Sequence, residues 1–149
     1  MQVLEGEGWR LLVDSARHPF PVLIGGEAWA AELTWAEAQE LRQLAAELER
    51  QLLAIADQLM PQEQIALELE QALNPGSLWM ELEGDCRSWS LRFVLTPAPG
   101  LRALEAGWGP QASAAITAAL QGQALTPISP APARSVGSPA ARTAGGRPQ

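Results

Sequence analysis

One long amphipathic helix constrains this chain more than any other feature of its sequence. Leucine and isoleucine recur every three or four positions between Leu41 and Leu59 and form a single apolar stripe. Thr34 and Glu37 have the spacing of a capping box, in which the hydroxyl and the carboxylate satisfy free N–H groups at a helix start. Pro61 sets the end, because the residue before a proline avoids the helical conformation. The pattern predicts a helix over residues 34–60, with its Glu- and Arg-rich side in solvent.

On both sides of this helix, apolar and polar residues alternate with a period of two, which is the pattern of half-buried strands. The alternation covers residues 9–13, 22–24 and 29–33 before the helix, and 78–83 and 89–95 after it. Gly25-Gly26 and Gly84-Asp85 are turn signals. Pro110 suits the first turn of a last helix over residues 111–120.

Residues 62–73 are ambiguous. Ile65, Leu67 and Leu69 alternate with glutamates as in a strand, yet Gln, Glu, Leu and Ala all favour a helix. We assign a strand to residues 65–70, which completes the order βββ-α-βββ-α. The sequence thus predicts an α+β domain over residues 1–125, with an antiparallel sheet and two helices on one of its faces.

Residues 126–149 differ in composition from the rest. They are almost entirely Pro, Ala, Ser, Gly, Thr and Arg, which supply too little apolar surface to offset the entropy of ordering the chain. We therefore predict a disordered tail. All 17 acidic residues precede Thr126 together with seven Arg, which gives the domain a net charge of −10 against +3 for the tail.

The charge and the composition narrow the possible partners and location. A negative domain repels phosphate backbones and anionic lipids, so nucleic-acid binding is not favoured. No apolar run is long enough to span a membrane, and the acidic N-terminus does not look like a signal peptide. Cys86 is the only cysteine and can form no disulfide within the chain. We expect a cytoplasmic protein.

Several segments, in this order and spacing, resemble a cyanobacterial family known as domain of unknown function 1818. The resemblance covers about residues 4–120. It rests on Glu5-Gly6-Glu7-Gly8-Trp9-Arg10, Ile24-Gly25-Gly26-Glu27-Ala28-Trp29, Glu32-Leu33, Leu59-Met60, Leu78-Trp79-Met80-Glu81-Leu82-Glu83-Gly84, Ser90-Leu91-Arg92 and Glu105-Ala106-Gly107-Trp108. It implies a fold similar to the Whirly-type single-stranded-DNA-binding transcriptional regulators, in which a β-then-α unit occurs twice. It implies no activity, because the family has none established and a fold does not determine a function.

The six tryptophans are the first candidates for a functional role. Trp9, Trp29 and Trp89 are in phase with apolar neighbours, which indicates the core. Trp79 has the opposite phase, beside glutamates, and Trp35 lies in the first helical turn, off the apolar stripe. Trp79 and Trp35 are thus the candidates for an exposed aromatic surface, with core or edge packing as the more common role of such residues.

Paired carboxylates are the second candidate. Residues two apart share a strand face, so Glu68, Glu70, Glu81 and Glu83 would gather on one surface if their strands pair, with Arg92 on the next strand neutralising part of it. Such a surface could hold a divalent cation, supply an acid/base pair, or remain a solvated face. Any interaction of the domain with a partner is expected there.

The residue types of known catalytic and cofactor sites are otherwise scattered. His18 and Cys86 lie in turns with no partner close in sequence, and Glu5-Gly6-Glu7-Gly8 is expected to be a flexible lead-in to Trp9. No phosphate loop, zinc pattern or triad is present, so we expect no cofactor, no metal and no catalytic residue. The leading hypothesis is a non-enzymatic module that binds an unknown protein through the sheet face. The alternatives are single-stranded nucleic-acid binding and a small hydrolase or metal-dependent enzyme that uses the acidic strand face.

Overall fold

The computed structural model describes residues 1–125, which form two β-then-α halves. The first half contains β1 (Gln2–Gly6), β2 (Trp9–Val13), β3 (Val22–Gly25), β4 (Ala30–Leu33), α1 (Trp35–Ile55) and the 3-10 turn η1 (Ala56–Gln58). The second half contains β5 (Ile65–Ala72), β6 (Ser77–Gly84), β7 (Trp89–Thr96), β8 (Leu104–Trp108) and α2 (Pro110–Gln121). The tail predicted for residues 126–149 lies outside the described part of the chain.

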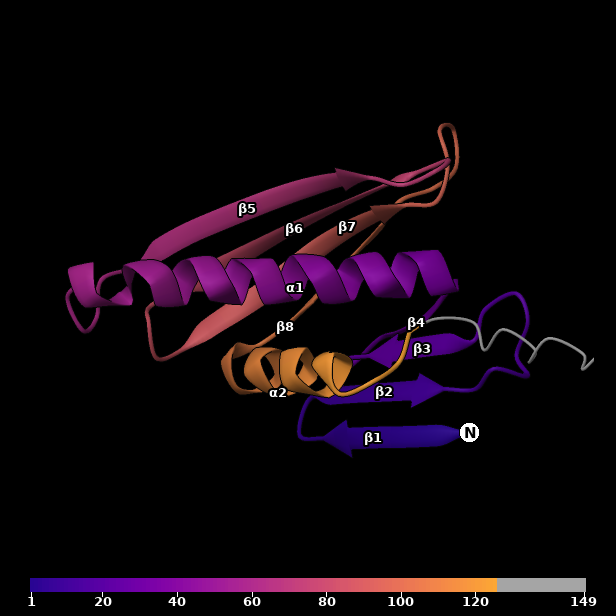
Figure 1. The fold of residues 1–149 in the computed structure, drawn as a ribbon, viewed down its shortest axis with the longest axis horizontal. Coiled ribbons are helices and arrows are strands. Elements are labelled where there is room, and N and C mark those ends of the chain that lie inside the picture. The colour runs from indigo at the N-terminus through magenta and orange to yellow at the C-terminus, as the bar shows by residue number, and fades with distance from the viewer. Residues whose placement is uncertain (126–149) are drawn as a thin grey trace, which may run out of the picture.

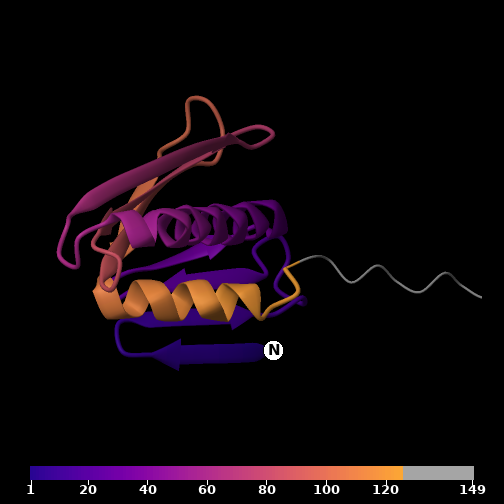
Figure 2. The ribbon, with the colours of Figure 1, turned by 60° about the vertical axis from the view of Figure 1, so that its left-hand side comes forward.

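The strands form two antiparallel sheets of four, each in sequence order. In Figure 1, β5 and β6 lie above α1, β7 and β8 cross behind it toward the level of α2, and β1–β4 lie below it; the turned view in Figure 2 again shows β5 and β1 on opposite sides of α1. α1 packs on β5 and β6, whereas α2 packs on β7 and β2. The helices therefore fill the space between the two sheets, and each sheet keeps one face outward.

The α+β class, the antiparallel strands and the two β-then-α halves are confirmed. The structure adds β1 and β8, which the sequence did not reveal, and divides the strands between two sheets. Residues 5–8 are not a flexible lead-in: they end β1 and form a two-residue turn into β2, where Gly8 has a φ of +77°. Such a φ suits glycine because other residues meet a steric penalty there.

The helix boundaries differ slightly from the prediction for α1. The capping box is present, since Thr34 Oγ1 accepts from Glu37 N and the Glu37 carboxylate accepts from Thr34 N. The α-helix ends at Ile55 rather than Met60, and η1 continues it as a tighter turn. Leu53 and Met60 are exposed at this end, so core packing does not hold the last predicted turn in α-helical form. The ambiguous segment is a strand, as predicted, and runs two residues further to Ala72.

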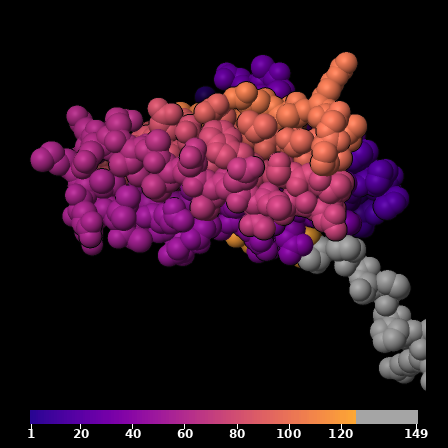
Figure 3. Space-filling model, turned by 90° about the horizontal axis from the view of Figure 1, so that it is seen from above, coloured from indigo at the N-terminus to yellow at the C-terminus, as the bar shows by residue number. Residues whose placement is uncertain are grey.

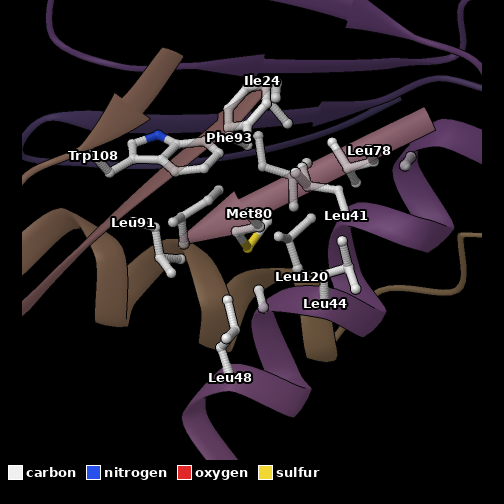
Figure 4. Close-up of a cluster of buried hydrophobic side chains, with 14 of the residues drawn as sticks. Ile24, Leu41, Leu44, Leu48, Leu78, Met80, Leu91, Phe93, Trp108 and Leu120 are labelled. Atoms are coloured by element: carbon white, nitrogen blue, oxygen red, sulfur yellow. The ribbon is translucent and has the colours of Figure 1, made fainter. Parts of the chain in front are cut away.

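A single hydrophobic cluster contains residues from both sheets and both helices. The predicted stripe of α1 supplies Leu41, Leu44, Leu48 and Leu52, and Met80 and Phe93 project from the facing strands (Figure 4). Each Å² of apolar surface removed from water contributes about 25 cal/mol to the free energy of folding. This cluster is therefore the main source of stability.

Two tryptophans join the halves through reciprocal hydrogen bonds. Trp29 Nε1 donates to the carbonyl oxygen of Gly107 at 3.0 Å, and Trp108 Nε1 donates to that of Gly25 at 3.0 Å. Their ring centroids are 5.2 Å apart, and Phe93 lies within 5.8 Å of both. Aromatic contacts in this range stabilise a fold beyond their buried area.

A buried hydroxyl completes the joint between β7, β8 and α2. Ser113 Oγ accepts from Leu91 N at 2.9 Å and donates to the carbonyl oxygen of Trp108 at 2.8 Å. Leu91 and Trp108 are opposite each other in the ladder, so the hydroxyl bridges the two strands where their direct pairing ends. Ser113 is fully buried, and its hydrogen bonds satisfy groups that water cannot reach.

We predict that Ser113→Ala lowers the free energy of unfolding by about 1–3 kcal/mol, because it leaves the buried Leu91 N–H without an acceptor. Urea unfolding measures this change. Ser90→Ala is the matched control, since Ser90 is a partly exposed neighbour on β7 and should change stability by less than about 0.5 kcal/mol. Equal effects of the two substitutions would contradict this role of Ser113.

Candidate functional site

The outward face of β5–β8 carries most of the side chains that the sequence indicated. The register places Glu81 between Glu68 on β5 and Arg92 on β7, and pairs Glu70 with Trp79 and Glu83 with Ser90. Alternation along each strand turns all of these residues away from the core. The six predicted residues of these strands therefore lie on one surface, here called the acidic face: Glu68, Glu70, Trp79, Glu81, Glu83 and Arg92.

Glu105 on β8 belongs to the same face and was not predicted. It is opposite Val94 in the ladder, two residues along the strand from the partner of Arg92. Its strand has little periodicity in the sequence, because β8 is short and contains the small residues Ala106 and Gly107. With Glu105 included, the strand positions of the acidic face have five carboxylates and one guanidinium.

Arg92 organises the charges of the acidic face. Its guanidinium forms ion pairs with Glu105 at 2.6 Å and Glu81 at 3.2 Å. The hydrogen bonds that Arg92 donates to Glu105 and Glu81 raise the pKa of Arg92 above its ordinary value. The guanidinium carbon also lies 4.9 Å from the Trp79 ring centroid, a distance at which a cation is attracted to the ring face.

The β5 side of the acidic face has no comparable cation. Glu68 is directly opposite Glu81 in the ladder, and like charges in this arrangement destabilise a sheet. Glu68 accepts a hydrogen bond from Trp79 Nε1 at 3.3 Å, which orients its carboxylate without neutralising it. Glu68, Glu81 and Arg92 stand side by side across β5, β6 and β7. Arg92 compensates the charge of Glu81, and the charge of Glu68 at the β5 end of this row stays negative.

Trp35 does not belong to this surface. Its indole is half-buried and packs against the core from the first turn of α1. Core or edge packing is the more common role of such a residue, and the first turn of α1 provides it here because it follows β4 directly. Trp79 is also half-buried, with its ring against Arg92. Trp89 is buried, and Trp9 and Trp29 pack against the core, as expected.

The acidic face is broad and has no deep hollow where Figure 3 views the molecule from above. A cavity of about 440 Å³ lies at its edge, where Glu83 and Ser90 are among the lining residues, and two others lie at the ends of the domain. One of about 660 Å³ lies at the start of α2 beside Glu7, Glu27 and Trp108. The other, of about 690 Å³, is mostly apolar and has Phe20 and Leu101 among its lining residues. The sequence predicted neither cavity, because each is built from turns that are distant in the chain.

The remaining candidates form no recognisable catalytic group. His18 is exposed in the loop before β3, and Cys86 is half-buried in the β6–β7 turn. Within residues 1–125, no three His, Cys, Asp or Glu side chains are grouped as metal ligands require. In the same residues, every buried side-chain nitrogen or oxygen has a hydrogen-bond partner. None of the described helices combines the length and apolarity needed to cross a bilayer.

The comparisons with known proteins show the family. A family model described as Domain of unknown function (DUF1818) matches residues 4–123. The chain belongs to this family. A crystal structure from Prochlorococcus sp. NATL2A, described as a protein with unknown function from the DUF155 family, is 37% identical to this DUF1818 chain. The match has a TM-score of 0.73 and covers 82% of this chain and 98% of the other. Among curated proteins, the search gives no match.

Proposed function

We propose that this domain is a non-enzymatic, cytoplasmic module that binds another protein through its acidic face. The observation that carries the proposal is the arrangement on β5–β8. A half-buried aromatic ring, Trp79, lies among five carboxylates, on a broad surface that no other described element covers. A flat face with a central aromatic residue suits a macromolecular partner better than a small ligand, which needs a cavity.

The charge of the face selects the partner. Arg92 is its one cation, and both of its ion pairs are made within the sheet. The carboxylates of Glu70 and Glu83 form no ion pair within the described residues. A partner with Lys or Arg in matching positions would gain complementary contacts, which speed association and exclude acidic competitors. We therefore propose a basic protein surface as the partner.

The proposal predicts that an immobilised chain recovers a stoichiometric, basic partner from an extract of cells that contain the protein. Glu70→Lys with Glu83→Lys should abolish this recovery, because the double variant reverses two charges on the acidic face. Glu7→Lys with Glu27→Lys changes the net charge equally in the β1–β2 and β3–β4 turns, outside the acidic face, and should retain the partner. The absence of any stoichiometric partner, or its loss with both double variants, would contradict the proposal.

Binding of single-stranded nucleic acid is the second candidate. The stacked pair of Trp79 and Arg92 is the observation that favours it, because aromatic and guanidinium planes both stack on bases. The two β-then-α halves also support the resemblance to the Whirly-type fold. The five carboxylates around the pair oppose it, since they repel phosphates.

If the acidic face bound nucleic acid, an oligonucleotide added at low salt would quench tryptophan fluorescence, and Trp79→Phe would remove most of the change. We expect no quenching at micromolar oligonucleotide, because the acidic face disfavours the encounter. Saturable quenching that depends on Trp79 would make nucleic acid the better account of this face.

A further inference from the structure

The edge of the acidic face is an unpaired strand. β5 has eight residues and pairs only with β6, at the end of the order β5-β6-β7-β8. Apart from this ladder, none of the hydrogen bonds of residues 1–125 involves the backbone of β5. A strand edge of this length offers a row of N–H and C=O groups to which another strand can bind.

The hydrogen-bond pattern identifies these free groups. Leu73 N donates to the carbonyl oxygen of Gly76 and continues the β5–β6 ladder beyond Ala72. Antiparallel ladders alternate between bonded and non-bonded pairs, so the odd-numbered residues of β5 bond to β6. The bond from Asp85 N to the Ser88 carbonyl oxygen fixes the same alternation from the β6–β7 side. The N–H and C=O groups of Ala66, Glu68, Glu70 and Ala72 therefore point to the free edge.

The side chains at this edge differ between its two faces. On the acidic face, a residue added opposite Glu68 would stand about 5 Å away between Cβ atoms. It would complete the row Glu68–Glu81–Arg92, whose β5 end has no cation. A residue opposite Glu70 would meet a carboxylate that forms no ion pair in the described residues. Both positions on an added strand favour Lys or Arg.

On the inner face, the edge favours apolar residues. Ile65, Leu67 and Leu69 are only half-buried although they pack against the core, because α1 covers the sheet incompletely at its margin. The alternate residues of an added strand would lie beside these three side chains and remove their exposed surface from water. An added strand would thus alternate basic residues with aliphatic ones.

We propose that β5 accepts an extended segment of another protein as a fifth strand, in which Lys or Arg alternates with aliphatic residues. This inference rests on the proposed protein-binding function and specifies the partner's chemistry and mode of binding. A second copy of this chain does not fit, because antiparallel pairing of two β5 strands over their full length places Glu68 of one copy opposite Glu70 of the other. No two arginines of the chain are separated by a single residue, and it has no lysine, so the segment comes from a different protein.

The test uses the full chain and a ten-residue peptide that alternates Arg and Val. Amide exchange followed by NMR should show about tenfold or greater slowing at Glu68 and Glu70 on peptide binding, because their N–H groups become hydrogen-bonded. The odd-numbered amides, which are already bonded to β6, should change little. A peptide that alternates Glu and Val should not bind. Failure of the Arg–Val peptide to bind would overturn the edge proposal, whereas the extract experiment judges the proposed function separately.

Two substitutions separate edge pairing from general attraction to the acidic face. Glu68→Gln should weaken peptide binding about two- to fivefold, the strength of one cross-strand charge pair. Glu83→Gln removes the same charge one strand further in and should have little effect. Ala66→Pro removes an outward N–H group, a change that edge strands tolerate, and should weaken binding about tenfold. Binding that slows no β5 amide and is weakened equally by Glu68→Gln and Glu83→Gln would refute edge pairing while leaving binding through the face intact.

Discussion

Two indole hydrogen bonds that cross between the halves of the chain fix the arrangement on which the remaining structure depends. Trp29 reaches from the first half to Gly107, and Trp108 reaches from the second half to Gly25. Glycine is required at one acceptor, since a Cβ at Gly107 would lie 2.5 Å from the Leu91 carbonyl oxygen. With the sheets joined at this point, the apolar sides of both helices are buried between them, and the other sides stay in solvent.

This enclosure decides which surfaces can meet a partner. The inner faces of both sheets are used by α1 and α2, so the domain presents the outward faces of its sheets, its strand edges, the exposed sides of its helices and the turns at its two ends. On the β5–β8 sheet the outward face is acidic and is organised by Arg92. The guanidinium of Arg92 compensates the charges of Glu81 on β6 and Glu105 on β8, but not the charges on β5. The unpaired edge therefore coincides with the uncompensated part of the charge, and together they define the surface that we propose for a partner.

Local patterns in the sequence predicted what depends on local geometry. The period of two placed six residues of the acidic face correctly, and the capping box located the start of α1, because these features need only neighbours along one element. β1 and β8 escaped prediction since short strands with Gly and Ala have little periodicity. The packing of Trp35 against the core depends on the path of β4, which the phase of the helix does not encode. The pairing of Trp29 with Gly107 joins residues 78 positions apart, which no local pattern encodes.

A double-mutant cycle on Trp29 and Trp108 tests most directly the claim that these residues form one joint between the halves. Trp29→Phe and Trp108→Phe each remove one indole donor, and each should lower the free energy of unfolding by about 1–3 kcal/mol. If the joint is a single unit, the double variant should lose less than the sum, with a coupling energy of at least about 0.5 kcal/mol in urea unfolding. Losses that add to within about 0.3 kcal/mol would contradict a shared joint.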